Sequence, residues 1–486
     1  MKFVLKHILY YKSLLFSITY PNILQKSEFI VIMEKHFKVG EEFLMIKKGA
    51  LTGLLLFGMF FGAGNLIFPP QLGLESGPQF WAAIAGFVLS GVGIAILTLV
   101  VGASNPKGYM DEISQKIAPW FAIAYLVVLY LSIGPFFAIP RTATTAFSVG
   151  IEPMLPADSH TIWLFIFTTI YFVLAYIIAL NPSKILDSIG RYLTPIFAIL
   201  IVVLVVLGAF RYGVAAPQPA TAEYAGAAFG AGFLQGYNTL DALASVAFSV
   251  VAVATLNQLG FKNRKEYVST IWVVGILVAM GFSILYIGLG FLGNHFPLDT
   301  AQLPQGANIG ASVLSSATQA IFGPVAQIFL AVMVTVTCFT TTAGLIVSTG
   351  EFFHNTFPKL SYKVYATVFT LIGFVIANLG LNAIIQYSLP VLMILYPITI
   401  TIVMIVIVNK ILPLSKPGMQ FTIAIVALIA AASVLAPQFK IKGLENMINS
   451  LPLAGASLPW LLPAIAGIIV SLFLPNKQKS ERFELD

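Results

Sequence analysis

The chain has 486 residues, of which 58% are hydrophobic and only 9% are charged, and its mean hydropathy is +0.92. Soluble globular proteins carry about 25% charged residues, so this composition excludes a soluble globular domain. Apolar runs of roughly 18 or more residues recur along most of the sequence, and a helix needs about 20 to cross a bilayer. The sequence therefore predicts an all-α, polytopic membrane protein.

The formal net charge of +7 does not indicate a nucleic-acid partner. Lys and Arg gather in alternate loops, as membrane orientation requires, and not on one face. The single cysteine, Cys338, excludes an internal disulfide and a cysteine metal cluster, and the five histidines are scattered. We therefore expect no cofactor, and lipid and a small solute as the partners.

Residues 1–46 form an N-terminal extension that differs from the rest of the chain. Charged residues such as Lys6 and Lys12 interrupt its apolar stretches, which are too broken for a membrane span. The clean apolar run and small-residue cleavage site of a signal peptide are also missing. Two alternatives follow: translation begins at Met33 or Met45, or the extension lies in the cytoplasm.

Windowed hydrophobicity predicts twelve membrane helices after this extension. Their ranges are 49–74, 79–103, 117–140, 160–180, 190–210, 226–258, 268–292, 318–349, 363–380, 383–408, 420–436 and 459–475. The first five form one unit, residues 47–212, and the next five a second unit, residues 220–410. Helices eleven and twelve occupy residues 418–475, and a short tail follows at 476–486. The loops on one side carry most of the Lys and Arg, which predicts that both termini are cytoplasmic.

Two predicted spans contain residues that interrupt a helix. The first has Gly62-Ala63-Gly64-Asn65 at its middle, and the sixth has the polar run of residues 236–241. These spans begin the two five-helix units, and paired interruptions at corresponding positions indicate an inverted-repeat transporter. Five crossings reverse the starting side, so the second unit is inverted relative to the first.

Such breaks supply binding groups inside a membrane. Unwound backbone leaves amide and carbonyl groups unpaired at a cost of several kcal/mol each, so it persists only where it is buried or lines a cavity. Freed amides at the start of a half-helix suit a carboxylate, and freed carbonyls at the end of the preceding half suit a small cation. One broken helix can therefore hold an amino acid and a sodium ion. Close packing of small residues is the simpler alternative for the glycine stretch.

Asp241 is the only carboxylate deep within a predicted helix of the core. An acid inside a membrane is costly and is by default a functional candidate, so we expect it to bind the cation or the amino group of the substrate. The alternative is that it caps the second half of helix six. The same alternatives apply to Tyr237, Asn238 and Thr239, of which Tyr237 is favoured over Thr239 for substrate contact.

Four motifs, in order, closely resemble the branched-chain amino acid:cation symporter family (BrnQ-like, LIVCS). They are "GLLLFGMFFGAGNLIFPPQLGLESG", "GPFFAIPRTATTAF", "GYNTLDALA" and "SLPVLMILYP", and the resemblance covers residues 47–475. It implies symport of leucine, isoleucine and valine with Na⁺ across a bacterial cell (inner) membrane. It also implies a LeuT-type fold, with a 5+5 inverted repeat, broken helices 1 and 6, and two extra helices.

The resemblance further implies particular site residues. The amides of Ala63 and Gly64 would bind the substrate carboxylate. Sodium would be held, through carbonyls or side chains, by Gly58, Phe61, Asn65, Cys338, Thr341 and Thr342. Threonine hydroxyls that only bond to their own helix are the alternative for the eighth span.

A branched aliphatic substrate needs an apolar pocket, for which Phe137 and Phe233 are the chosen residues and Ile133 and Phe136 are further candidates. In a chain with 39 phenylalanines, any one of them is more often plain core or lipid contact. One methylene is worth only about 1–3 kcal/mol, so the sequence does not rank leucine, isoleucine and valine.

Two features outside the breaks also drew a prediction. Arg141 follows the predicted outer end of helix three, where we expect a structural or gating role rather than substrate contact. Residues 301–323, rich in Gly, Ser and Asn, are predicted to form an outer lid before helix eight.

Sodium-driven secondary transport by alternating access is the leading functional hypothesis. The same fold coupled to protons, with Asp241 as the carrier, is the first alternative. A channel would need symmetric copies or charged rings, which are not visible. The spans carry no paired catalytic carboxylates and no nucleophile–histidine set, and no GxxxxGK[ST] loop occurs. We therefore expect a transporter and not an enzyme.

Overall fold

The computed structural model describes residues 53, 56–105, 107–180, 184–258, 264–304 and 306–475. The predicted N-terminal extension, residues 1–46, and the predicted tail, residues 476–486, lie outside these ranges. The described residues form helices and connecting turns, with no β-strand among them. The predicted all-α fold class is confirmed.

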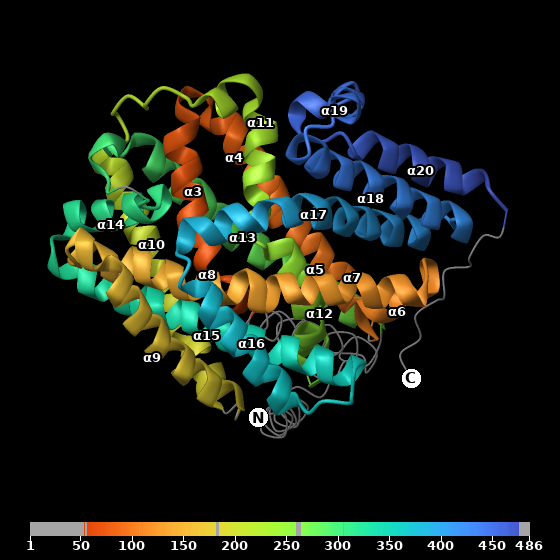
Figure 1. Cartoon of the computed structure of the whole chain (residues 1–486), viewed down its shortest axis with the longest axis horizontal. Coiled ribbons are helices and arrows are strands. Elements are labelled where there is room, and N and C mark those ends of the chain that lie inside the picture. The colour runs from red at the N-terminus through yellow and green to blue at the C-terminus, as the bar shows by residue number, and fades with distance from the viewer. Residues whose placement is uncertain are drawn as a thin grey trace, which may run out of the picture. The chain divides into compact units, whose positions relative to one another are not determined.

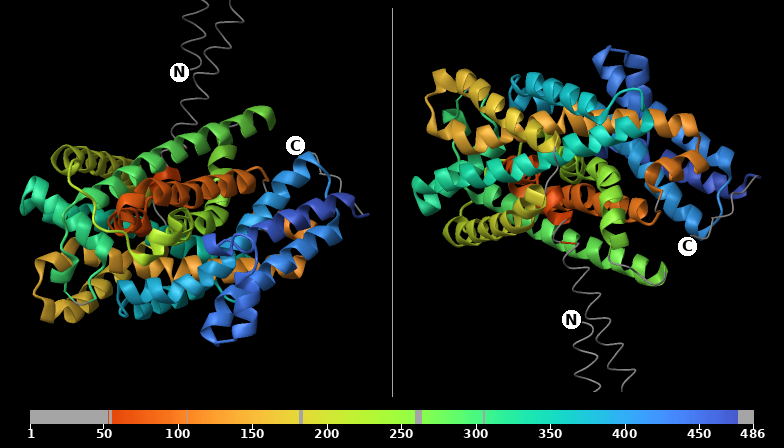
Figure 2. Two further views of the ribbon diagram at one scale, coloured as in Figure 1. Left: turned by 90° about the horizontal axis from the view of Figure 1, so that it is seen from above. Right: turned by 90° about the horizontal axis from the view of Figure 1, so that it is seen from below.

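Figures 1 and 2 show helices packed against one another, with no sheet among the residues drawn as ribbon. The first part contains α3 (Ala63–Ser76), α4 (Phe80–Val88), α5 (Ala95–Ala103), α6 (Gly108–Lys116), α7 (Pro119–Leu131), α8 (Ala138–Ala146), α9 (His160–Leu180) and α10 (Lys184–Tyr212). The second part contains α11 (Ala222–Tyr237), α12 (Asp241–Gln258), α13 (Arg264–His295), α14 (Ile309–Phe322), α15 (Val325–Thr356), α16 (Tyr362–Ala377), α17 (Leu381–Ile411), α18 (Lys416–Gln438), α19 (Lys442–Asn449) and α20 (Leu461–Phe473).

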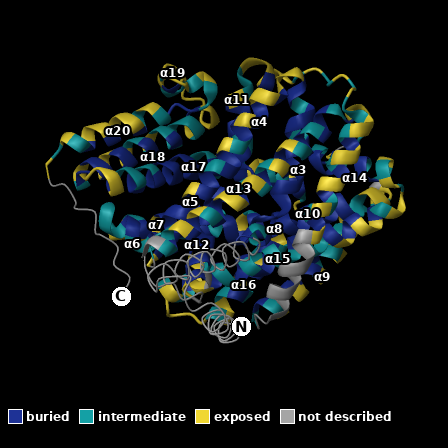
Figure 3. Ribbon diagram, turned by 180° about the vertical axis from the view of Figure 1, so that it is seen from behind, coloured by how far each residue is buried: buried dark blue, intermediate teal, exposed yellow. Residues whose placement is uncertain are grey.

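Seven helical runs of the described chain are long and apolar enough to cross a membrane, and the bent pair α11–α12 brings the number to eight. Each of the twelve predicted ranges contains a helix of the structure. Large apolar side chains are exposed on outer faces, as Trp163, Ile170 and Ile177 are on α9. Almost all residues of α3 are buried, whereas Figure 3 shows many exposed ones on α19 and α20. An apolar outer face of this extent is stable in lipid and not in water.

The first membrane helix is interrupted at Phe61 and Gly62. Its first half ends with the hydrogen bond from the Phe61 amide to the Phe57 carbonyl (2.9 Å), and α3 begins at Ala63. The predicted extent of this break, residues 62–65, is therefore wrong. One extended residue, Gly62 (φ −124°, ψ −165°), is enough to redirect the chain, and the residues after it adopt helical angles.

The sixth membrane helix is interrupted where the sequence predicts it. The half-helix α11 ends at Tyr237, α12 begins at Asp241, and the two are bent by 42°. Between them, Leu240 adopts a left-handed conformation (φ 65°), which is uncommon for a residue other than glycine. The predicted break is confirmed.

The third span differs from its prediction in length. It runs over Pro119–Met154, with a kink at Gly134 (φ −93°, ψ −120°) followed by Pro135. The predicted end at residue 140 is wrong, because hydropathy windows stop at a charged residue. Arg141 in fact lies within α8, inside the span.

The two broken helices meet inside the protein. A Cβ added at Gly64 would lie 3.1 Å from the Cα of Thr239 and 3.2 Å from its carbonyl oxygen. Glycine therefore allows α3 to approach the α11–α12 break at this distance. The helix α14, within the predicted lid, packs on α3 at Gly310, whose added Cβ would lie 1.8 Å from the Ile67 carbonyl oxygen. Figure 1 shows α3 between α13 and α14.

Candidate functional site

The two breaks, together with α8 and α15, enclose a cavity of about 40 Å³. Its wall combines apolar side chains with polar groups from four separate segments, an arrangement typical of a small-molecule site. The lining residues are Met59, Phe60, Gly62, Ala63, Gly64, Asn65, Ile133, Ala138, Arg141, Thr142, Thr239, Leu240, Asp241, Ala244, Phe248, Thr341 and Leu345.

The first break offers unpaired backbone groups of both kinds. The last helical hydrogen bond before it is accepted at Phe57, so the carbonyls of residues 58–61 have no helical partner. After it, Ala63 and Gly64 are the first residues of α3, and Gly62 provides no side chain to cap their amides. Partial negative and partial positive charge thus lie only a few residues apart, and both amide-bearing residues line the cavity.

Asp241 is held by side chains from two other helices. The amide nitrogen of Asn65, on α3, donates to its carboxylate oxygens at 3.1 and 3.3 Å. The hydroxyl of Tyr286, on α13, donates to it at 2.6 Å, and Asn65 also donates to this hydroxyl. All three residues are buried. The carboxylate at the start of α12 therefore links both broken helices to α13.

Arg141 projects from α8 into the same cavity and is only 3% exposed. Its Nη2 donates to the Thr239 carbonyl oxygen at 3.5 Å, and its guanidinium lies 5.4 Å from the ring centroid of Phe68. Its Nη1 has no hydrogen-bond partner. Of the two ion pairs in the part of the chain that the structure describes, neither includes Arg141 or Asp241. The cavity thus contains two opposite charges that are not paired with each other.

Thr341 is the α15 threonine that faces the first break. It lines the cavity, and a Cβ added at Gly62 would lie 3.6 Å from its hydroxyl oxygen. Its hydroxyl donates to the Thr337 carbonyl at 3.3 Å, a long bond that leaves the oxygen free to accept or to coordinate. Thr341 therefore adds a hydroxyl to the carbonyls of the break.

Thr342 faces away from that break. Its hydroxyl bonds to the Cys338 carbonyl (3.0 Å), to the Tyr171 hydroxyl (2.8 Å) and to the hydroxyl of Thr142. It is fully buried and does not line the cavity. The structure thus separates two neighbouring hydroxyls that the sequence had grouped together.

The aromatic residues chosen from the sequence lie outside the lining. Phe233 packs edge-on against Tyr237 (ring centroids 5.5 Å apart), and Tyr237 stacks on Tyr396 (4.1 Å). Phe137 is half-buried at the start of α8. Gly58, Phe61 and Cys338 also stand outside the lining.

Sequence reasoning missed part of the cavity wall. Its apolar part includes Phe60, Phe248 and Leu345, which nothing in a phenylalanine- and leucine-rich sequence distinguishes from core residues. Arg141 could have been found, because the small and apolar residues that follow it allow the span to continue. Ile133, a candidate from the sequence, does line the cavity.

Comparison with known families gives a match over residues 45–478 to the family model described as branched-chain amino acid transport protein. A protein of Staphylococcus aureus (strain USA300), described as a branched-chain amino acid carrier protein, is 41% identical over 451 residues. That alignment covers 90% of this chain and 100% of the relative. A protein of the same description from Staphylococcus saprophyticus is 39% identical over 444 residues, which cover 90% of this chain and 98% of the relative.

Solved transporter structures share the fold. Mhp1, a nucleobase-cation-symport-1 family transporter, superimposes in its inward-facing conformation with a TM-score of 0.52 at 15% identity, covering 89% of this chain and 93% of Mhp1. A Na⁺-coupled sialic acid symporter gives 0.51 at 14% identity, covering 89% and 91%. At this level of identity the likeness establishes the fold alone, which is of the LeuT type.

Proposed function

Because this chain belongs to the branched-chain amino acid transport family, we propose that it imports leucine, isoleucine and valine together with sodium. It would act in the bacterial cell (inner) membrane, with both termini in the cytoplasm, since Lys and Arg concentrate in the corresponding loops. The observation that carries the proposal is the meeting of two broken helices at a buried cavity with freed amides, freed carbonyls and a carboxylate. Paired broken helices of this kind hold the substrate and the coupling ion in secondary transporters.

The proposed sodium site lies at the first break. The carbonyl oxygens of Gly58 and Phe61 are hard ligands without helical partners, and the Thr341 hydroxyl faces this segment from α15. The Cys338 carbonyl already accepts a hydrogen bond from the Thr342 hydroxyl. We therefore assign Thr341 as the sodium ligand from α15 in preference to Cys338 and Thr342. Sodium would bind more strongly when the two helices are close together, and it would thereby favour one conformation over the other.

The proposed substrate site lies on the other side of the break. The amides of Ala63 and Gly64 would bind the carboxylate of the substrate, and Asp241 would provide the negative charge for its ammonium group. The aliphatic side chain would contact the apolar wall that includes Phe248. Tyr237 lies outside the cavity lining, and its stack on Tyr396 would hold the end of α11 in position.

The size of the cavity supports a conformational cycle. One water occupies roughly 10–15 Å³ on the same measure, so about 40 Å³ has room for about three waters and not for a leucine. Binding therefore requires α3, α8, α12 and α15 to separate, which is the movement that alternating access needs. The hydrogen bond from Asn65 on α3 to Asp241 on α12 would be made when these helices are close together and broken when they separate.

Proton coupling is the second candidate. The buried carboxylate of Asp241 accepts hydrogen bonds from Asn65 and Tyr286, and a hydroxyl and an amide can bond to either protonation state. In that case Asp241 would carry the proton, and the carbonyls of the first break would need no ion.

Uptake of labelled leucine into liposomes containing the purified protein tests the proposal. We expect accumulation with inward sodium at clamped pH, competition by isoleucine and valine, and none by lysine or glutamate. Potassium in place of sodium, with and without an inward proton gradient, is the matched control. Uptake driven by protons and indifferent to sodium would support the second candidate, and no uptake by folded protein would refute both.

A further inference from the structure

Arg141 is a buried charged side chain whose bonding capacity is only partly used. A charge inside a membrane span is costly and is rarely kept without a partner. Here the side chain is 3% exposed, its Nη1 has no hydrogen-bond partner, and it lines the cavity between the two breaks. A buried N–H left unsatisfied is costly, and more so when it is charged.

The contacts that Arg141 does make hold the guanidinium in place. Phe68 supports it from α3 at 5.4 Å, and the Thr239 carbonyl accepts from Nη2 at 3.5 Å. The carbonyl contact partly neutralises the negative end of α11, which is a structural role for one nitrogen. It leaves Nη1 without a partner on a residue that lines the cavity, and Asp241 is not within ion-pair distance.

We propose that Arg141 binds the carboxylate of the transported amino acid, so that two fixed side-chain charges, Arg141 and Asp241, recognise the two ends of the zwitterion. The inference rests on the proposed transport of amino acids and adds to it a side-chain anchor beside the α3 amides. A guanidinium offers several N–H donors in a planar fork that matches a carboxylate. The ligand class is therefore an α-amino acid with a free carboxylate, and the corresponding esters, amides and alcohols should bind more weakly.

The separation of Arg141 from Asp241 also has a functional consequence in this arrangement. If Arg141 and Asp241 were paired, the substrate would have to break the pair before it could bind. Because α8 carries the positive charge and α12 the negative charge, a zwitterion connects these helices while satisfying both side chains. The substrate itself would then hold the closed state together.

The test is competition against labelled leucine, with sodium present, on the purified full-length protein. Leucinol keeps the ammonium and the side chain but has a hydroxymethyl group in place of the carboxylate. We expect wild-type protein to bind leucinol roughly 10- to 100-fold more weakly than leucine, the value of charge-assisted hydrogen bonds. Arg141→Gln should weaken leucine binding by a similar factor and change leucinol binding by less than about threefold. Preference for the carboxylate would then shrink to the part that the α3 amides supply.

Two further variants complete the test. Arg141→Lys keeps the charge without the fork and should retain part of the preference. Arg211→Gln is the matched control, because Arg211 is an arginine at the end of α10 that donates to the Ala320 carbonyl (2.7 Å) outside the cavity. It should behave as wild type. Size-exclusion profiles and thermal unfolding check that each variant is folded.

Several outcomes would overturn the inference. Equal affinity of the wild-type protein for leucine and leucinol would do so without any variant, even if Arg141→Gln failed to fold. Folded Arg141→Gln that prefers leucine over leucinol by the same factor as wild type would also do so, and would leave the transport proposal intact. Wild-type protein that binds no branched-chain amino acid would overturn both.

Discussion

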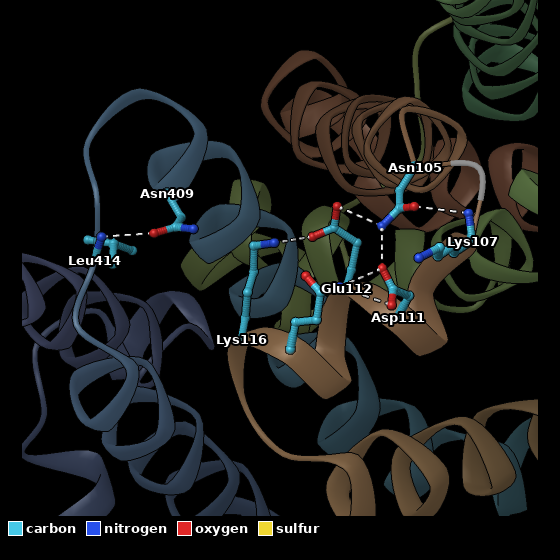
Figure 4. Close-up of polar contacts among 8 residues, drawn as sticks. Asn105, Lys107, Asp111, Glu112, Lys116, Asn409 and Leu414 are labelled. Carbon is cyan, nitrogen blue, oxygen red and sulfur yellow. Dashed lines mark hydrogen bonds and ion pairs between the residues drawn. The ribbon is translucent and has the colours of Figure 1, made fainter. Parts of the chain in front are cut away.

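The charged groups of the central cavity and those of α6 are bonded in opposite ways. The Asn105 amide, in the turn before α6, donates to Asp111 at 3.2 Å and to Glu112 at 3.1 Å, and Glu112 pairs with Lys116 on the same helix (Figure 4). The Asn105 side-chain oxygen accepts from the Lys107 amide at 2.9 Å. Every partner comes from the same short stretch, and these acids have nearby donors.

In the cavity, the partners come from distant parts of the chain. Asn65 and Asp241 are 176 positions apart, and Asp241 and Tyr286 are 45 apart. One nitrogen of Arg141 has no partner at all. The comparison teaches that a local charge cluster can satisfy itself and stabilise its own helix. Charges assembled by the fold and left incompletely paired are, in our proposal, completed by a ligand.

The largest effect is expected from Asp241→Asn in the cavity. The substitution removes the negative charge, and the Asn65 amide and the Tyr286 hydroxyl lose a charged acceptor. Hydrogen bonds to charged groups are worth about 1.5–3 kcal/mol each, so the initial rate of leucine uptake should fall by roughly 100-fold or more. Proteoliposome uptake measures it, with size-exclusion as the check on folding. Uptake within about threefold of wild type would show that the cavity carboxylate is as dispensable for transport as the carboxylates of α6.

The next largest effect is expected from Gly64→Ala. The new Cβ would lie 3.1 to 3.3 Å from the backbone of the sixth-helix break, and overpacking of this kind costs about 1–3 kcal/mol. We expect leucine uptake to fall roughly tenfold, because the two breaks must separate slightly. Gly344→Ala on α15 is the matched control, since its added Cβ meets nothing within 4 Å and uptake should stay near wild type. Equal effects of both substitutions would mean that close approach of the breaks does not matter.

The sequence predicted those parts of the site that carry a local signal. An acid or a glycine–asparagine run in the middle of an apolar span is improbable for an ordinary membrane helix, so Asp241 and the two breaks could be found. Hydropathy likewise located a helix within each of the twelve predicted ranges, because long apolar runs are a local signal. The extent of the first break could not be found, because Gly64 and Asn65 are compatible with either helix or loop.

The rest of the site depends on tertiary contacts. A charged residue ends a hydropathy window, so the prediction placed Arg141 outside its span. Its hydrogen-bond partner Thr239 is 98 positions away in the sequence, and only the fold brings the two together. Successive residues on a helix differ by about 100° in direction, so only the rotation of α15 against its neighbours decides which threonine faces the break. Packing around Tyr171 fixes that rotation by taking the Thr342 hydroxyl.

A smaller effect, confined to the sodium dependence, is expected from Thr341→Ala. Losing one neutral ligand of about 1 kcal/mol should raise the sodium concentration for half-maximal uptake roughly fivefold, with little change in stability. Thr342→Ala is the matched variant, because it removes the partner of Tyr171 and of the Cys338 carbonyl. It should lower the unfolding midpoint and leave the sodium dependence unchanged. The reverse pattern would place the ion on the other side of α15.

The smallest effect is expected from Asp111→Asn on α6, the same chemical change as in the cavity. Asp111 is half-buried and accepts from Asn105 and from Gln115 (3.1 Å), and an asparagine oxygen can still accept one of these bonds. Pairs at such positions contribute less than about 1 kcal/mol, so the unfolding midpoint should fall by only a few degrees and leucine uptake should not change. Uptake and thermal unfolding of both Asp→Asn variants, measured side by side, decide the matter. Loss of uptake in Asp111→Asn at unchanged stability would mean that α6 takes part in transport. A group that only stabilises its own helix cannot affect uptake without affecting unfolding.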